Sequence, residues 1–110
     1  MTRQRTPGKR IRIFLGEAQQ WQGQPLYRAI LELVQQHGAR GATVLRGIEG
    51  FGPHHHLSTD RLPDISENLP LVIDIVESNE RVEALLPILD RVVQRGMITV
   101  TPVEILTRES

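Results

Sequence analysis

The 110-residue chain contains no cysteine, and aromatic residues make up only 4% of it. The lack of cysteine excludes disulfides, thiolate zinc sites and cysteine nucleophiles. Its 13 basic and 13 acidic side chains cancel, so no overall positive field attracts nucleic acid. No apolar run approaches the roughly 18 residues of a membrane span. These absences leave one ordinary soluble domain, with no nucleic acid expected as a partner.

The first ten residues, Met1 to Arg10, are basic but include no apolar core like that of a secretory signal. We therefore expect a cytoplasmic protein. Residues 1–9 are expected to form a flexible basic lead, residues 10–106 a single domain, and residues 107–110 a C-terminal tail.

Four segments are typical of strands, because their apolar residues alternate or are β-branched. They span residues 10–15, 41–52, 69–76 and 97–106. Apolar residues recur at helical spacing between the first and second strands and again between the third and fourth. The predicted order is therefore β-α-β-β-α-β.

Local signals place the ends of the two helices. Pro25 is predicted as the first residue of the first helix, and Gly38 as the glycine that ends it. Asn79 is predicted to cap the second helix, and Gly96 to end it. Pro87 lies inside the second helix and predicts a kink or a helix in two pieces.

This order predicts an α+β, ferredoxin-like fold in which two helices cover one face of a four-stranded antiparallel sheet. A long loop joins the second and third strands. The uncovered face must then meet solvent or another subunit, and its candidate residues are Phe14, Val72, Val76 and Val103. Apolar residues on that face favour a homo-oligomer.

The second strand carries the most informative pattern, because it turns into glycine at positions 47, 50 and 52 before the long polar loop. Glycine allows positive φ and close approach by another backbone or a ligand. A strand that opens into a long loop is a common way to present a recognition element on a rigid scaffold.

The chain resembles the PII signal-transduction superfamily, and within it the PII-like family catalogued as a domain of unknown function. The resemblance covers about residues 9 to 106. It is carried by Gly16-Glu17, Pro25-Leu26-Tyr27, Gly38, the run from Gly41 to Gly52, Leu69-Pro70-Leu71-Val72-Ile73, Leu86-Pro87 and Gly96-Met97-Ile98-Thr99.

The resemblance implies a regulatory homotrimer without catalytic activity that binds a small effector between subunits. The effector would be a nucleotide, typically an adenine nucleotide, or an anion. The 52–68 loop would then act on a target, for which a membrane transporter or channel is implied. One departure concerns the PII loop that grips phosphates, which is reduced here to Arg95-Gly96-Met97. ATP binding in the PII manner is therefore not expected, whereas a mononucleotide or small anion remains open.

The candidate effector-binding residues lie along the second strand and the start of the loop. Thr43, Gly50, Phe51 and Gly52 match the strand-to-loop segment of PII that forms one wall of its ligand cleft. Arg46 could meet an effector's phosphate or carboxylate, or could pair with Glu49 or with a neighbouring subunit. The full candidate set is Thr43, Arg46, Gly47, Glu49, Gly50, Phe51, Gly52 and His56.

The run His54-His55-His56 supports an alternative function, a divalent-metal-binding trimer. Imidazoles are good ligands for zinc, copper or nickel, and a threefold axis could bring three copies together. No carboxylate stands at ligand spacing beside them, and His56 could instead hydrogen-bond an anionic effector. Catalysis is not expected, because the chain has no Walker A motif, nucleophile triad or carboxylate pair in an apolar cleft.

Overall fold

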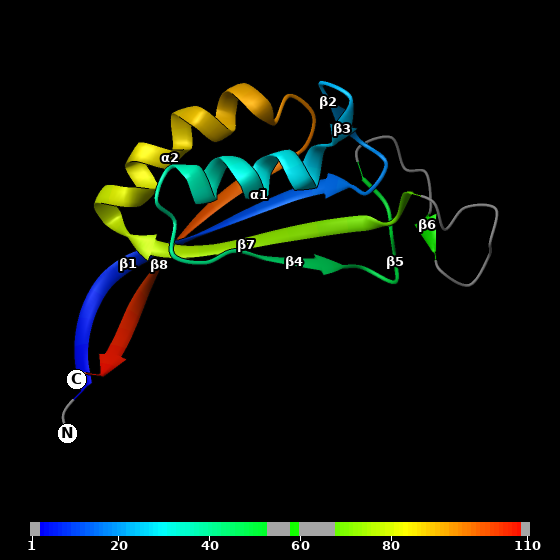
Figure 1. Ribbon diagram of the computed structural model, residues 1–110. Helices are drawn as coiled ribbons and strands as arrows, with labels where there is room; N and C mark the ends of the chain where they lie inside the picture. Colours follow the sequence, from blue (N-terminus) through cyan, green and yellow to red (C-terminus); the bar gives the residue numbers. More distant parts are fainter. Residues whose placement is uncertain (1–2, 53–57, 60–67, 109–110) are drawn as a thin grey trace.

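The computed structural model describes residues 3–52, 58–59 and 68–108. A four-stranded antiparallel sheet has the order β4-β7-β1-β8. Two helices lie together on one face of it (Figure 1). The strands of this sheet are β1 (Arg3–Gly16), β4 (Thr43–Arg46), β7 (Pro70–Ser78) and β8 (Met97–Arg108), and the helices are α1 (Leu26–Gln36) and α2 (Asn79–Val92). The predicted β-α-β-β-α-β, ferredoxin-like fold is confirmed.

Two short ladders accompany the main sheet. In one, β2 (Gln20–Trp21) pairs with β3 (Gln24–Pro25) ahead of α1. In the other, β5 (Glu49–Gly50) pairs with β6 (Ser58–Thr59) at the end of the sheet opposite the chain termini (Figure 1). Within the described ranges, neither helix is long and apolar enough to cross a membrane.

The core lies between the helices and the sheet. Alternation on β1 and β7 sends every second side chain toward the helices, and these side chains are almost wholly buried. Each fully buried aliphatic side chain contributes about 1.5–3 kcal/mol relative to exposure. The core residues with no more than 1% exposure are Ile11, Ile13, Ile30, Val34, Ile73, Ile75, Val82, Leu85 and Leu89.

Among residues 3–52, 58–59 and 68–108, no helix covers the opposite face of the sheet (Figure 1). Phe14 pairs with Val72, Arg10 with Val76, and Gly8 with Val103, so these side chains alternate with the core positions of β1. The sequence therefore assigned Phe14, Val72, Val76 and Val103 correctly to the uncovered face. The oligomer that would cover this face stays a prediction.

The predicted flexible lead over residues 1–9 is wrong for the described residues from Arg3 onward. β1 begins at Arg3, and residues 3–8 pair with residues 103–108 of β8 as an arm that extends beyond the helices (Figure 1). The predicted tail from residue 107 likewise belongs to β8 up to Arg108. Each segment looked irregular by itself because its hydrogen-bond partner lies about a hundred residues away. Pro7 is tolerated because β1 has only one neighbour there.

The start of each helix differs from prediction by one residue. Pro25 precedes α1 with φ −57° and ψ 133°, so it is the N-cap and not the first helical residue. Ser78 caps α2, since its Oγ accepts a hydrogen bond from the Arg81 backbone N–H at 3.3 Å. Asn79 is therefore the first helical residue, because the β7 strand extends far enough to place Ser78 at the turn.

α2 is continuous through Pro87, so a helix in two pieces is wrong. Proline inside a helix costs about 3 kcal/mol. Pro87 faces solvent, and the buried stripe on the opposite side of α2 holds residues on both sides of it against the sheet. Gly38 follows α1 with φ +86°, as predicted for the glycine that ends it, whereas α2 ends at Val92 before Gly96.

Candidate functional site

The predicted second strand over residues 41–52 is not continuous. β4 covers only Thr43–Arg46, and the chain leaves the main sheet after Gly47. The Gly47 N–H donates to the Pro70 carbonyl at 2.7 Å, and this hydrogen bond joins the strand end to the first residue of β7. Glu49–Gly50 then pairs with Ser58–Thr59 instead. The strand is broken because its later residues find their partner in the loop and not in the sheet.

Two of the glycines at this break lie close to Pro70. A Cβ on Gly47 would lie 2.8 Å from Pro70 Cγ, and one on Gly50 would lie 3.2 Å from the same atom. Both glycines therefore let the strand end pack directly on the first residue of β7. By contrast, no described residue lies within 4 Å of a Cβ built on Gly52. Gly47 and Gly50 are thus brought together at the base of the loop.

β4 is an edge strand, and its alternation divides the predicted site residues between two faces. Thr43 is paired with Asp74 on the helix-free face. Arg46 is paired with Leu71, whose side chain lies on the helix-covered face. Thr43 and Arg46 therefore do not converge within one chain, although the sequence grouped them.

Arg46 forms an ion pair with Glu17, through Nη2 and Oε2. Neither pairing considered from the sequence, with Glu49 or with another subunit, accounts for this contact. The Glu17 backbone N–H donates to the Leu69 carbonyl at 2.9 Å, and the next residue, Ala18, donates to Asn68 Oδ1 at 2.9 Å. The Glu17 carboxylate is therefore held on a fixed turn that faces the end of β4.

A cavity of about 230 Å³ lies beside this ion pair. Its walls come from the turn after β1, the start of α1, β4 and β7. It combines one cation, one carboxylate and a phenol with two aliphatic side chains. The residues that line it are Glu17, Tyr27, Val44, Arg46 and Leu71.

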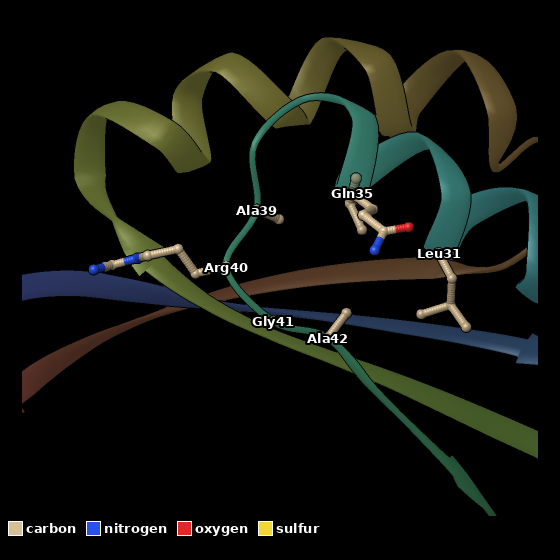
Figure 2. Close-up of a pocket in the computed structure, with 7 residues that line it drawn as sticks. Leu31, Gln35, Ala39, Arg40, Gly41 and Ala42 are labelled. Atoms are coloured by element: carbon tan, nitrogen blue, oxygen red, sulfur yellow. The ribbon is translucent and has the colours of Figure 1, made fainter.

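A second, larger cavity of about 380 Å³ lies under the later half of α1. In Figure 2 the side chains of Leu31 and Gln35 point from α1 toward the segment Ala39–Ala42. The Arg40 side chain points away from the cavity. This cavity offers almost no polar side chain apart from the Gln35 amide. None of the predicted site residues lines it.

The remaining candidate site residues lie after Arg46 in the sequence, on β5 and beyond it. Glu49 is exposed on β5, and Phe51 is 67% exposed. The metal ligands proposed from the sequence, His54, His55 and His56, lie outside the described residues. Among the residues that the structure describes, no three His, Asp or Glu side chains form a group that could hold a metal ion. The metal site therefore stays a prediction.

Sequence reasoning missed the partners of Arg46. Glu17 and Tyr27 were both part of the resemblance, but neither was named as a candidate site residue. The available signal was the unusual sequence Gly16-Glu17 directly after an alternating strand, which places a carboxylate at a strand end. Nothing in the spacing between residues 17 and 46 indicates that they meet.

One protein family matches this chain over almost the whole of its described residues. The profile of the DUF190 family, described as "Uncharacterized ACR, COG1993", matches residues 8–105. A UPF0166 protein of Aquifex aeolicus is 32% identical over 98 residues, which are 89% of this chain and 92% of that protein. A UPF0166 protein of Methanocaldococcus jannaschii is 31% identical over 103 residues, covering 93% and 94% of the two chains.

Solved structures with the same fold are PII-like proteins. CPII from Thiomonas intermedia K12, bound to ADP and bicarbonate, matches with a TM-score of 0.68 and 18% identity, covering 93% of this chain and 91% of that one. The same protein bound to ADP, AMP and acetate matches with a TM-score of 0.66 and 19% identity over the same shares. A putative PII-like signalling protein from Thermus thermophilus matches with a TM-score of 0.62 and 18% identity, over 94% and 91%.

The family profile matches nearly the whole chain. The matched residues include most of the four-stranded sheet, the two helices on one face of it, and the edge strand that breaks at Gly47 and Gly50. The chain belongs to the DUF190 (UPF0166) family and has the fold of the PII-like proteins.

Proposed function

We propose that this protein is a non-catalytic PII-like regulator that binds a small effector, a mononucleotide or a small anion, in clefts between the subunits of a homotrimer. The 52–68 loop would carry the signal to a target, for which a membrane transporter or channel remains the expectation from the resemblance. Effector binding would change this loop through its base at Gly47 and Gly50.

The observation that carries the proposal is the construction of the loop base. The edge strand leaves the sheet where two glycines pack on Pro70, and Arg46 stands directly before them. A ligand bound there would contact the strand end and the loop at once. CPII, which has the same fold, was solved with ADP, AMP and bicarbonate, and this makes adenine nucleotides and bicarbonate the first effectors to test.

The first experiment is a thermal-shift panel on the intact protein with AMP, ADP, bicarbonate and a neutral control, adenosine. A ligand that binds only the folded state stabilises it by about 2.7 kcal/mol at a hundred times its Kd. We expect an anionic member of the panel to raise the melting temperature. No shift with any of them would overturn the proposal, as would a folded monomer in light scattering for its trimeric part.

The loop base itself is tested by replacing Gly50 with valine. A Cβ at Gly50 already lies 3.2 Å from Pro70 Cγ, so the branched side chain must push β5 away from β7. We expect Gly50→Val to weaken effector binding at least tenfold in calorimetry, with an unchanged oligomer and a smaller effect for Gly50→Ala. Unchanged affinity in the valine variant would remove Gly50 from the site.

A further inference from the structure

We propose that the cavity beside Arg46 is a small-oxyanion site in which the ligand takes the place of the Glu17 carboxylate on the Arg46 guanidinium. The ligand class is a carboxylate, bicarbonate or phosphate group on a compact body. The inference rests on the proposed function and names the side chains that would select its effector.

The ion pair itself indicates the chemistry that Arg46 accepts. A guanidinium presents a planar fork of N–H donors that suits the two oxygens of a carboxylate or phosphate. In this structure the Glu17 carboxylate contacts one arm of that fork, through Oε2 and the Arg46 Nη2. The same donors can serve any oxyanion of similar shape that reaches them.

The pair is also accessible and inexpensive to exchange. The Arg46 side chain is 61% exposed and that of Glu17 is 22% exposed. Ion pairs near the surface contribute little to stability, because water solvates both partners when they separate. Separating Arg46 from Glu17 therefore opposes anion binding only weakly, and the main opposition comes from the negative charge of the Glu17 carboxylate.

The adjoining cavity gives the rest of a ligand a place to lie. Its volume of about 230 Å³ is below the roughly 300–1,000 Å³ of ordinary small-molecule pockets, which favours a compact ligand. Val44 and Leu71 supply an apolar wall, and the Tyr27 side chain contributes a phenol at its edge. A small anion with a modest apolar or planar part fits this combination better than a bare metal ion or a long chain.

Glu17 has a second effect, because its backbone cannot move away. Its N–H is bonded to Leu69, and its turn is further held where the Gln19 side chain donates to the Arg95 carbonyl at 3.0 Å. The displaced carboxylate therefore stays close to the bound anion and repels it. Glu17 thus lowers the affinity of the site and sets the effector concentration at which it fills.

The test measures binding of AMP, inorganic phosphate and adenosine by calorimetry to the intact protein and three variants. We expect Glu17→Gln to tighten AMP and phosphate binding at least tenfold, because the competing charge is gone while the shape is kept. Arg46→Gln should weaken the binding of AMP and of phosphate at least tenfold. The affinities of Arg46→Lys should lie between those of the unchanged protein and of Arg46→Gln, since lysine keeps the positive charge but not the planar fork of donors. The affinity for adenosine, which carries no phosphate, should be the same in all three variants as in the unchanged protein.

A matched control comes from another exposed arginine–glutamate pair, Arg5–Glu104 at 3.0 Å on the β1/β8 arm. Glu104→Gln should leave AMP and phosphate affinity within twofold of the unchanged protein. If the unchanged protein binds AMP or phosphate but the changes at Glu17 and Arg46 leave both affinities within twofold, the inference is overturned and the proposed function stands. If neither the unchanged protein nor Glu17→Gln binds any probe, both fail.

Discussion

Replacing Glu77 with alanine is expected to lower the free energy of unfolding by about 3 kcal/mol, the lower end of the range for breaking a buried ion pair. The Glu77 side chain is only 1% exposed, although it carries a carboxylate. Its Oε2 accepts a hydrogen bond from the Arg40 backbone N–H at 2.7 Å. Its Oε1 lies 3.6 Å from Arg40 Nε and 3.4 Å from Arg81 Nε.

These contacts join three parts of the fold at one carboxylate. Arg40 belongs to the segment that leads into β4, and Arg81 lies in the first turn of α2. Arg81 also donates to the His37 carbonyl, at the end of α1, at 3.2 Å. Alanine would leave the Arg40 N–H without its Glu77 partner and open a void where the buried carboxylate lies. The two arginines are exposed enough to be solvated, which keeps the loss at the lower end of the range.

The measurement is urea unfolding at one fixed protein concentration, because an oligomer's stability depends on concentration. Glu83 provides the matched control, since it pairs with Lys9 at 2.9 Å but is 63% exposed. Glu83→Ala should cost no more than about 1 kcal/mol. The loss of unfolding free energy for Glu77→Gln should lie between those for Glu77→Ala and Glu83→Ala, because glutamine keeps an acceptor for the Arg40 N–H. Equal losses for Glu77→Ala and Glu83→Ala would contradict the buried role of Glu77.

Replacing Gly96 with alanine is expected to destabilise the fold by about 2–6 kcal/mol, since backbone strain and overpacking each cost about 1–3 kcal/mol. Gly96 has φ +137°, a conformation that residues with a Cβ rarely adopt. An added Cβ would also lie 2.5 Å from the carbonyl oxygen of Phe14. That oxygen belongs to the backbone of β1, so it cannot rotate away as a side chain could.

Gly41 offers a control in the same kind of connection. In the part of the chain that the structure describes, nothing lies within 4 Å of a Cβ on Gly41, and the Gly41 φ is not positive. Gly41→Ala should therefore stabilise the protein by about 0.4–1 kcal/mol, because it restricts only the unfolded chain. Opposite signs for the two substitutions in denaturant unfolding are the expected result. A neutral Gly96→Ala would show that the α2–β8 connection can relax.

The sequence determined the fold because the apolar periodicities of its elements are strong and local. Ile11, Ile13 and Leu15 alternate in a single run, and both helical stripes recur at helical spacing. The short-range signals for the starts of the helices were right to within one residue, as at Ser78 and Asn79. Such features depend on neighbours in the chain, so they can be read without knowing the tertiary structure.

Only the tertiary structure decided where strands find their partners. Residues 3–8 became a strand because β8 lies beside them, and β5 left the sheet because Ser58–Thr59 pairs with it. The pairing of Arg46 with Glu17 was likewise set by the fold. It brings a strand end and a turn 29 positions apart onto the same side of the sheet. Residue type fixed which groups could interact, and three-dimensional packing fixed which of them met.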